Sequence, residues 1–274
     1  MKNRTVFLVS DSTGITAETL GHSLLTQFEA ENFKQVTLPF INTIEKADEA
    51  VARINRVAAQ DNLRPIIFST LVDDQLREHL LPANGLFLDF FQTFLAPLEG
   101  ELGVRSNHTS GRAHGLLDTV KYDQRIDATN YALTNDDGSH TRDYEQADLI
   151  LIGVSRSGKT PTCLYLALTY GVFVANYPLS EDELESGKIP SVLEPYKDKL
   201  YGLTIEAARL QQIRKVRRST GRYSTIQQVN YEIRAAEQLF KRFGIDFLNN
   251  THASIEEIAS NILNSTGVER RVSP

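Results

Sequence analysis

"ADLILIGVSRSGKTPTCLYLALTY", residues 147–170, is the stretch of the sequence that decides the fold. Its apolar start, 147–154, is typical of a buried strand, and a helical pattern follows from about Thr160. Between the two lies the spacing G-x-x-x-x-G-K-T, which begins at Gly153. A phosphate-binding loop needs glycines, a helix N-terminus, a lysine and a hydroxyl, and all of these are present. A chance turn is the alternative, but the flanking elements and the Lys-Thr ending favour a functional loop.

The residues of this loop have distinct expected roles. We expect Lys159 to contact the transferred phosphoryl group and Thr160 to bind a magnesium ion. Gly158 would allow the backbone to approach the phosphate closely. The predicted nucleotide-binding residues are Gly153, Val154, Ser155, Arg156, Ser157, Gly158, Lys159 and Thr160.

The segments after the loop continue the alternation of strands and helices. Strands are expected at 172–179, 200–205 and 245–250, and a closing helix at 254–264. This alternation predicts a parallel sheet with helical crossovers. The order of elements across 147–264 resembles that of small P-loop kinases, so we predict a C-terminal P-loop kinase-like domain.

The first half of the chain shows a similar alternation. Strands are expected at 5–10, 35–40 and 65–70, with helices between them, which predicts an N-terminal Rossmann-like parallel-sheet domain. The apolar run at 86–102 is expected to form a further buried helix.

A polar, turn-rich stretch at 103–143 separates the two halves and is the predicted junction. The fold class is therefore α/β with two domains. We assign 1–143 to an N-terminal regulatory or dimerisation domain that includes the junction, and 144–274 to the catalytic domain.

Composition narrows the class of protein. The net charge of −6 provides no overall basic surface, so nucleic-acid binding is not expected. The single cysteine, Cys163, excludes an internal disulfide and a cysteine-based zinc cluster. No apolar run approaches the ~18 residues of a membrane span, and the start "MKNRTVFLVSDSTG" is not typical of a signal peptide. We expect a cytoplasmic protein with no membrane partner.

Basic residues gather in "IRKVRRSTGRYS", residues 213–224. They could be a solvated helix end, because cations near a helix C-terminus are favoured by its dipole. They could instead form a lid whose arginines close over the phosphates, as in small P-loop kinases. We favour the lid, with Arg217, Arg218 and Arg222 as its phosphate-binding residues; Arg214 and Lys215 complete the cluster.

The carboxylate that would assist the transfer is harder to identify from the sequence. Glu181, Asp182 and Glu183 follow the expected strand 172–179, where acceptor-binding carboxylates can lie. They could equally be an acidic helix start that Ser180 caps. Asp182 is the candidate we name.

Two other polar stretches stand out. "SDSTGITAE", residues 10–18, could bind an anion at a helix start, although capping of that helix is the simpler interpretation. His108 and His114 lie in the junction without acidic or cysteine neighbours, which does not make a zinc site. A surface loop, or contact with the second domain or a partner protein, remains open for them.

Five motifs together resemble a known family. They are "SDSTGITAETLGH" (10–22), "YDQRIDATNYAL" (122–133), "DDG" (136–138), "GVSRSGKTPTCLYLA" (153–167) and "ANYPL" (175–179). They are similar to motifs of the bacterial phosphoenolpyruvate synthase regulatory proteins, which belong with the pyruvate, phosphate dikinase regulatory proteins. The Gly158-Lys159-Thr160 ending favours the synthase branch, and the resemblance spans nearly the whole chain.

The resemblance implies a bifunctional enzyme that forms homodimers. One activity is an ADP-dependent serine/threonine kinase, which inactivates phosphoenolpyruvate synthase by phosphorylating a threonine near its catalytic histidine. The other is a phosphorylase, which removes this phosphate with inorganic phosphate and releases pyrophosphate. The nucleotide site carried over by position is Gly153 through Thr160.

The residues themselves leave two rival functions open. A P-loop kinase for a small metabolite would need only the second domain and would use ATP with a small alcohol. A non-enzymatic nucleotide sensor would use the loop to switch partner binding.

Overall fold

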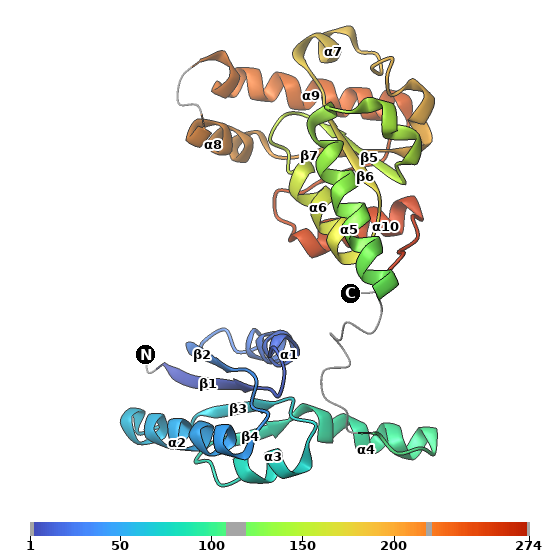
Figure 1. The fold of residues 1–274 in the computed structure, drawn as a ribbon. Helices are drawn as coiled ribbons and strands as arrows, with labels where there is room; N and C mark the ends of the chain where they lie inside the picture. Colours follow the sequence, from blue (N-terminus) through green and yellow to red (C-terminus); the bar gives the residue numbers. More distant parts are fainter. Residues whose placement is uncertain (1–2, 108–118, 218–220, 273–274) are drawn as a thin grey trace. The chain divides into compact units, whose positions relative to one another are not determined.

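The computed structural model describes residues 3–107, 119–217 and 221–272. The chain divides into two compact units, Met1–Gly115 and Leu116–Pro274, each with its own parallel sheet and its own core (Figure 1). Among the described residues, no helix combines the length and the apolar character needed to cross a membrane.

The first unit is a four-stranded parallel sheet in the order β2-β1-β3-β4. Successive residues of β1 alternate between its faces: Val6 and Leu8 pack with α1, whereas Phe7 and Val9 pack with α2 and α3. Both faces of the central strands are therefore buried, as expected for a parallel sheet. The elements are β1 (Arg4–Val9), α1 (Ile15–Leu25), β2 (Phe33–Leu38), α2 (Ile44–Asp61), β3 (Ile66–Ser69), α3 (Asp74–Leu80), β4 (Leu86–Asp89) and α4 (Phe90–Leu102).

The prediction of one buried helix at 86–102 was right about a helix over 90–102 but wrong about residues 86–89 and about burial. Residues Leu86–Asp89 form strand β4, which pairs with β3, and helix α4 begins at once with Asp89 as its N-cap. Phe90 is the one buried residue described in α4. A short apolar run fits either element in isolation, and here pairing with β3 selects the strand.

The second unit is also a four-stranded parallel sheet, in the order β6-β5-β7-β8. Together the two sheets confirm the predicted α/β class. The elements are α5 (Thr119–Thr134), η1 (Asp136–Gly138), η2 (Thr141–Gln146), β5 (Leu149–Gly153), α6 (Lys159–Tyr170), β6 (Val174–Pro178), α7 (Glu181–Ser186), η3 (Glu194–Lys199), β7 (Leu200–Thr204), α8 (Ala207–Arg217), η4 (Arg222–Ser224), α9 (Ile226–Phe243), β8 (Phe247–Asn249) and α10 (Ile255–Thr266).

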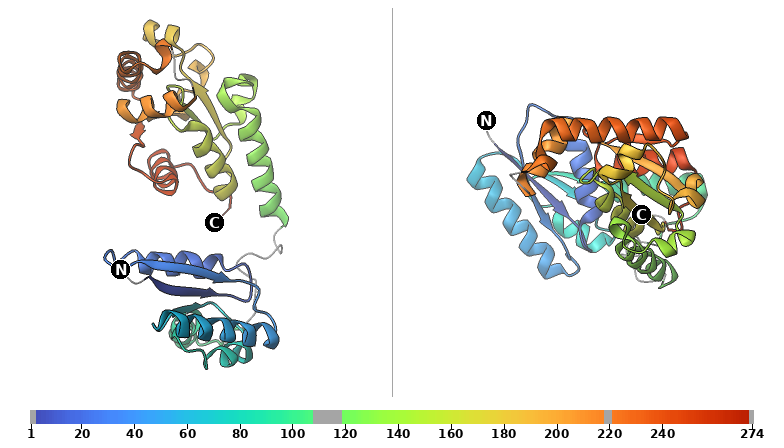
Figure 2. Two further views of the ribbon diagram at one scale, coloured as in Figure 1. Left: turned by 90° about the vertical axis from the view of Figure 1, so that its left-hand side faces the viewer. Right: turned by 90° about the horizontal axis from the view of Figure 1, so that it is seen from above.

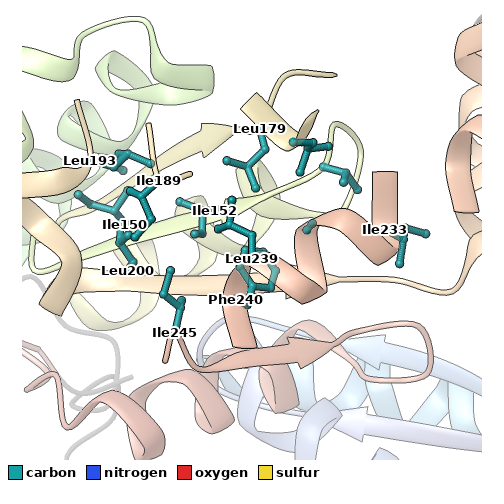
Figure 3. Packing of buried hydrophobic residues seen from close by; sticks show 14 of the residues in the cluster. Ile150, Ile152, Leu179, Ile189, Leu193, Leu200, Ile233, Leu239, Phe240 and Ile245 are labelled. Atoms are coloured by element: carbon teal, nitrogen blue, oxygen red, sulfur yellow. The ribbon is translucent and has the colours of Figure 1, made fainter. Parts of the chain in front are cut away.

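Strand β5 is buried on both faces. Leu149 and Leu151 pack with α5, α6 and α10, which cover one face of the sheet as the ribbon views in Figure 2 show. Ile150 and Ile152 join the cluster of α7, α8 and α9 (Figure 3). The chain passes from β5 to β6 on one side and later to β7 on the other. The loop after β5 therefore lies at the point where the strand order reverses, which is where open α/β sheets bind ligands.

The second unit begins earlier than the boundary expected at 143/144. Helix α5 packs along α6 and β6, and Tyr131 stacks on Phe173 with ring centroids 5.1 Å apart. Asn176 of β6 donates its backbone N–H to Asn135 O at the end of α5. The predicted junction, 103–143, was based on its polar, turn-rich composition, whereas the part from Leu116 onward belongs to the second unit.

Candidate functional site

The loop 153–160 connects β5 directly to α6 and depends on its two glycines. Gly158 caps α6 in the left-handed conformation, with φ = 87°. A Cβ on Gly158 would lie 2.8 Å from Asn250 Nδ2, which itself donates to Ser157 O at 2.7 Å. A Cβ on Gly153 would lie 2.3 Å from Leu203 O on β7. Only glycine therefore allows both close approaches.

Lys159, the first residue of α6, is almost fully buried beneath the loop. Its Nζ donates to Gly153 O at 3.2 Å and to Val154 O at 3.0 Å. Burial lowers the pKa of Lys159 to about 8, and the positive charge of Arg214 acts in the same direction, while Asp137 and Asp136 oppose the shift. The structure thus holds a titratable cation against the inner side of the loop.

This shifted pKa predicts that anion binding depends on pH. Only the protonated lysine attracts a phosphate, so we expect affinity for inorganic phosphate to fall as pH rises through about 8, the pKa of Lys159. Above this pH most Lys159 side chains are neutral, so each binding event must also take up one proton. The affinity for phosphate can therefore fall by at most about tenfold per pH unit. Titration calorimetry from pH 6.5 to about 9.5 measures the effect. The Lys159→Arg variant should lack this transition if it binds, and a flat profile in the unmodified protein would contradict the expectation.

Thr160 is joined to a carboxylate from a distant part of the sequence. Its Oγ1 donates to Asp136 Oδ1 at 2.8 Å, and Asn176 Nδ2 donates to the same oxygen at 2.5 Å. The backbone N–H of Asp137 donates to Asn176 Oδ1 at 3.1 Å. Asn176 is buried on β6, so it fixes both aspartates of the DDG segment beside the start of α6.

Lys159, Thr160 and Asp137 line a pocket of about 280 Å³. One side is formed by the loop and the start of α6, another by Asp137, and a third by α8. It thus brings a carboxylate, a buried lysine and an arginine to one place. The lining residues are Asp137, Ser155, Arg156, Gly158, Lys159, Thr160, Pro161, Ile213 and Arg217.

The basic residues of the predicted lid lie in different environments. Arg217 lines the pocket, whereas Arg214 is completely buried. Arg222 is largely exposed, and its Nη2 lies 2.9 Å from Glu181 Oε1. Arg218 lies outside the described residues. Of the two predicted arginines that the structure describes, Arg217 lines the pocket and Arg222 does not.

Asp182 is exposed on α7 and does not line the pocket. Ser180 and Glu183 form a reciprocal capping box at the start of this helix, so the capping interpretation of these acids is confirmed. Sequence reasoning missed Asp136 and Asp137. Their signal was the DDG motif itself, which was noted for its resemblance but was read as part of a polar turn.

The other polar stretches do not add to this site. Helix α1 begins at Gly14 in the left-handed conformation, with no side chain capping it, so the expected Ser/Thr cap is absent. Asp11 instead accepts the N–H of Val72 at 3.3 Å and links two loops. His108 and His114 lie outside the described residues. Among the residues that are described, no three His, Cys, Asp or Glu side chains form a group able to hold a metal ion.

The second unit thus defines an α/β protein with a glycine-bounded loop, a buried lysine and two aspartates at the carboxyl edge of its sheet. Residues 6–263 match the model of the Kinase/pyrophosphorylase family, and the chain belongs to this family. It is 53% identical over 269 residues to a Stutzerimonas stutzeri protein named "Putative phosphoenolpyruvate synthase regulatory protein", covering 98% of this chain and 99% of the relative. Proteins of the same name from Hahella chejuensis and Alkalilimnicola ehrlichii are 49% and 52% identical, each over 98% of this chain and 99% and 98% of their own lengths. The resemblance inferred from the motifs is confirmed.

Proposed function

We propose that the protein is a bifunctional serine/threonine kinase and phosphorylase that acts on phosphoenolpyruvate synthase in the cytoplasm. The observation that carries the proposal is that Lys159, Thr160 and Asp137 line one pocket, with Asp136 hydrogen-bonded to Thr160. Phosphoryl transfer needs positioning and charge stabilisation more than covalent chemistry, and these residue types provide both. The names of the relatives, which describe regulators of phosphoenolpyruvate synthase, support the choice of that enzyme as the protein substrate.

In the kinase direction, Asp137 would accept the proton of the threonine hydroxyl as its oxygen attacks the β-phosphorus of ADP. The bond between that phosphorus and the bridging oxygen breaks, and AMP leaves. Lys159, the backbone N–H groups of the loop and Arg217 would stabilise the charge that develops on the phosphoryl oxygens.

In the phosphorylase direction, inorganic phosphate attacks the phosphorus of the phosphothreonine. Asp137 returns a proton to the leaving threonine oxygen, and pyrophosphate is released. Both directions move one phosphoryl group between oxygens, so one set of residues could serve both.

ADP as the donor requires a shift of the nucleotide relative to ATP in an ordinary P-loop, because here the β-phosphate is the group transferred. We propose that ADP binds one phosphate further along the loop, with Lys159 on the departing group. A structure with bound ADP in which Lys159 contacts only the α-phosphate would contradict this arrangement.

A magnesium ion fits the residues at the start of α6. Magnesium is usually held by one or two carboxylates, together with phosphate oxygens and waters, and the paired Thr160 Oγ1 and Asp136 Oδ1 are oxygen donors of this kind. When bound, the ion would neutralise phosphate charge.

The direct test incubates the purified chain with purified phosphoenolpyruvate synthase and ADP labelled in the β-phosphate. We expect label on a synthase threonine, located by peptide mass spectrometry, and its release as pyrophosphate after inorganic phosphate is added. Turnover of ATP with a small alcohol would instead support the metabolite kinase. Nucleotide binding that changes association with the synthase, without any transfer, would support the sensor.

We further propose that the protein is a homodimer formed through the first unit. An apolar groove of about 830 Å³ there is bordered by exposed side chains of Leu24, Phe28, Leu86 and Leu88. Exposed apolar surface of this kind is typical of protein–protein contacts. Light scattering should give twice the chain mass for the unmodified protein and the chain mass for Phe28→Asp. The control Leu168→Asp, at an exposed position on α6, should remain dimeric, and a monomeric unmodified protein would contradict the proposal.

A further inference from the structure

Arg214 is completely buried in the second unit, although it belongs to the cluster of cations expected to face phosphate. Its Nη2 donates to Glu232 Oε2 on α9 at 2.6 Å. The same nitrogen donates to Ser155 O in the loop 153–160 at 3.0 Å. The guanidinium group therefore joins α8 and α9 to the loop.

Tyr223 makes the second connection to the same loop residue. Its hydroxyl lies 3.0 Å from Ser155 Oγ, and its ring lies under the Arg214 guanidinium, 4.2 Å from the centroid. Its carbonyl accepts from Arg214 Nη1 at 3.1 Å. Ser155 is thus held at its backbone carbonyl by one residue and at its side chain by the other.

The contact to Ser155 O has a consequence for the next peptide N–H. In a trans peptide the C=O and N–H groups point in opposite directions. Since Ser155 O points toward Arg214, the N–H of Arg156 points away from it. Arg156 itself has φ = 74°, a conformation that non-glycine residues adopt rarely, so surrounding contacts must hold it there.

A chain of contacts extends from Arg214 toward the segment that carries the remaining cations. Glu232 Oε1 accepts from Gln228 Nε2 at 3.0 Å, and Gln228 Oε1 accepts from Arg222 Nε at 3.0 Å. Arg222 and Tyr223 are neighbours in η4. The orientation of the loop peptide is therefore linked to the conformation of η4.

We propose that Arg214 and Tyr223 are positioning residues that orient the Ser155–Arg156 peptide, and so set the affinity of the loop for phosphate groups. This inference rests on the proposed function, because it takes the loop to bind phosphate. Arg214 acts through the peptide and does not contact the ligand. Simple stabilisation of the fold does not require an ion pair here, since buried pairs stabilise little more than apolar side chains of equal size.

The decisive variant is Tyr223→Phe, because it removes one hydroxyl and keeps the ring under Arg214. Loss of one hydrogen bond corresponds to about a three- to tenfold change in an equilibrium constant. We expect affinities for inorganic phosphate and for ADP, measured by titration calorimetry, to fall by a similar factor within this range. Tyr231→Phe, at a half-exposed position on α9, is the matched control and should change neither affinity.

Ser155→Ala removes the other side of the same contact and completes a double-mutant cycle. If the hydroxyl of Tyr223 acts through Ser155, Tyr223→Phe should cause no further loss of phosphate affinity in the Ser155→Ala background. Additive losses would overturn the proposal. Arg214→Lys keeps the positive charge but loses the planar guanidinium group, whose several N–H donors contact Ser155, Glu232 and Tyr223 together. We therefore expect it to weaken phosphate binding more than Tyr223→Phe does.

These measurements distinguish failure of the proposed function from failure of the positioning role of Arg214 and Tyr223. If the unmodified protein binds neither ADP nor inorganic phosphate, the proposed function fails. If it binds both and Tyr223→Phe binds them equally well, the positioning role is wrong and the proposed function stands. A lower melting temperature with unchanged affinities in both Tyr223→Phe and Arg214→Lys would show a purely structural role and would also overturn the proposal.

Discussion

Replacing Lys159 by alanine is expected to abolish both directions of the proposed reaction together. The lysine is the buried cation beneath the loop, and removal of one preorganised charge-stabilising group costs about 10²–10³-fold in rate. Both directions should fall substantially, because each transfers a phosphoryl group whose developing charge the same lysine would stabilise. Two assays measure the effect: ADP-dependent inactivation of purified phosphoenolpyruvate synthase, and its phosphate-dependent reactivation.

Lys188→Ala is the matched control for this variant. Lys188 is an exposed lysine that follows α7 and does not line the pocket. It should leave both rates unchanged. Unchanged inactivation by Lys159→Ala would remove the loop 153–160 from the mechanism, and loss of only one direction would show that the two activities use separate sites.

Asp137→Asn is expected to lower kcat by about 10²–10⁴-fold, the range for loss of a general base. The substitution is suited to this position because Asp137 has φ = 51°, which asparagine tolerates and alanine does not. The backbone N–H that donates to Asn176 Oδ1 is also retained. We therefore expect ADP affinity to stay within about threefold of the unmodified protein, since the change removes proton transfer and not the phosphate contacts.

Asp182→Asn separates the two carboxylate assignments. Asp182 is exposed on α7, outside the pocket, so its loss should not affect turnover. Loss of activity in Asp182→Asn with full activity in Asp137→Asn would restore the assignment that the sequence alone suggested. Measurements of kcat and of ADP binding on both variants, made side by side, provide this comparison.

The local part of the site was predictable because it lies within one short segment. Strand β5, the two glycines of the loop and the start of α6 at Lys159 follow from apolar patterning, backbone permissiveness and helix capping. The alternation of strands and helices likewise predicted two parallel sheets. Neighbouring residues along the chain are sufficient to determine these features.

The partners of that segment were decided by tertiary structure. Asp136 reaches Thr160 from 24 residues away, and Arg214 reaches Ser155 from 59 residues away. The sequence showed an acidic pair in a polar turn, and it showed Arg214 only as a member of a basic cluster, without a role of its own. Packing gave both their environments: α5 and β6 bring the aspartates to the edge of the sheet, and Glu232 pairs with Arg214 inside the core.

The sequence by itself thus determined the α/β class and the loop, because these depend on local spacing and periodicity, and its motifs identified the family by resemblance. Only the tertiary structure decided which carboxylates and which cations face that loop. The physical reason is that a charged side chain takes its role from its burial and its partners, and in this protein those partners come from strands and helices far apart in the chain.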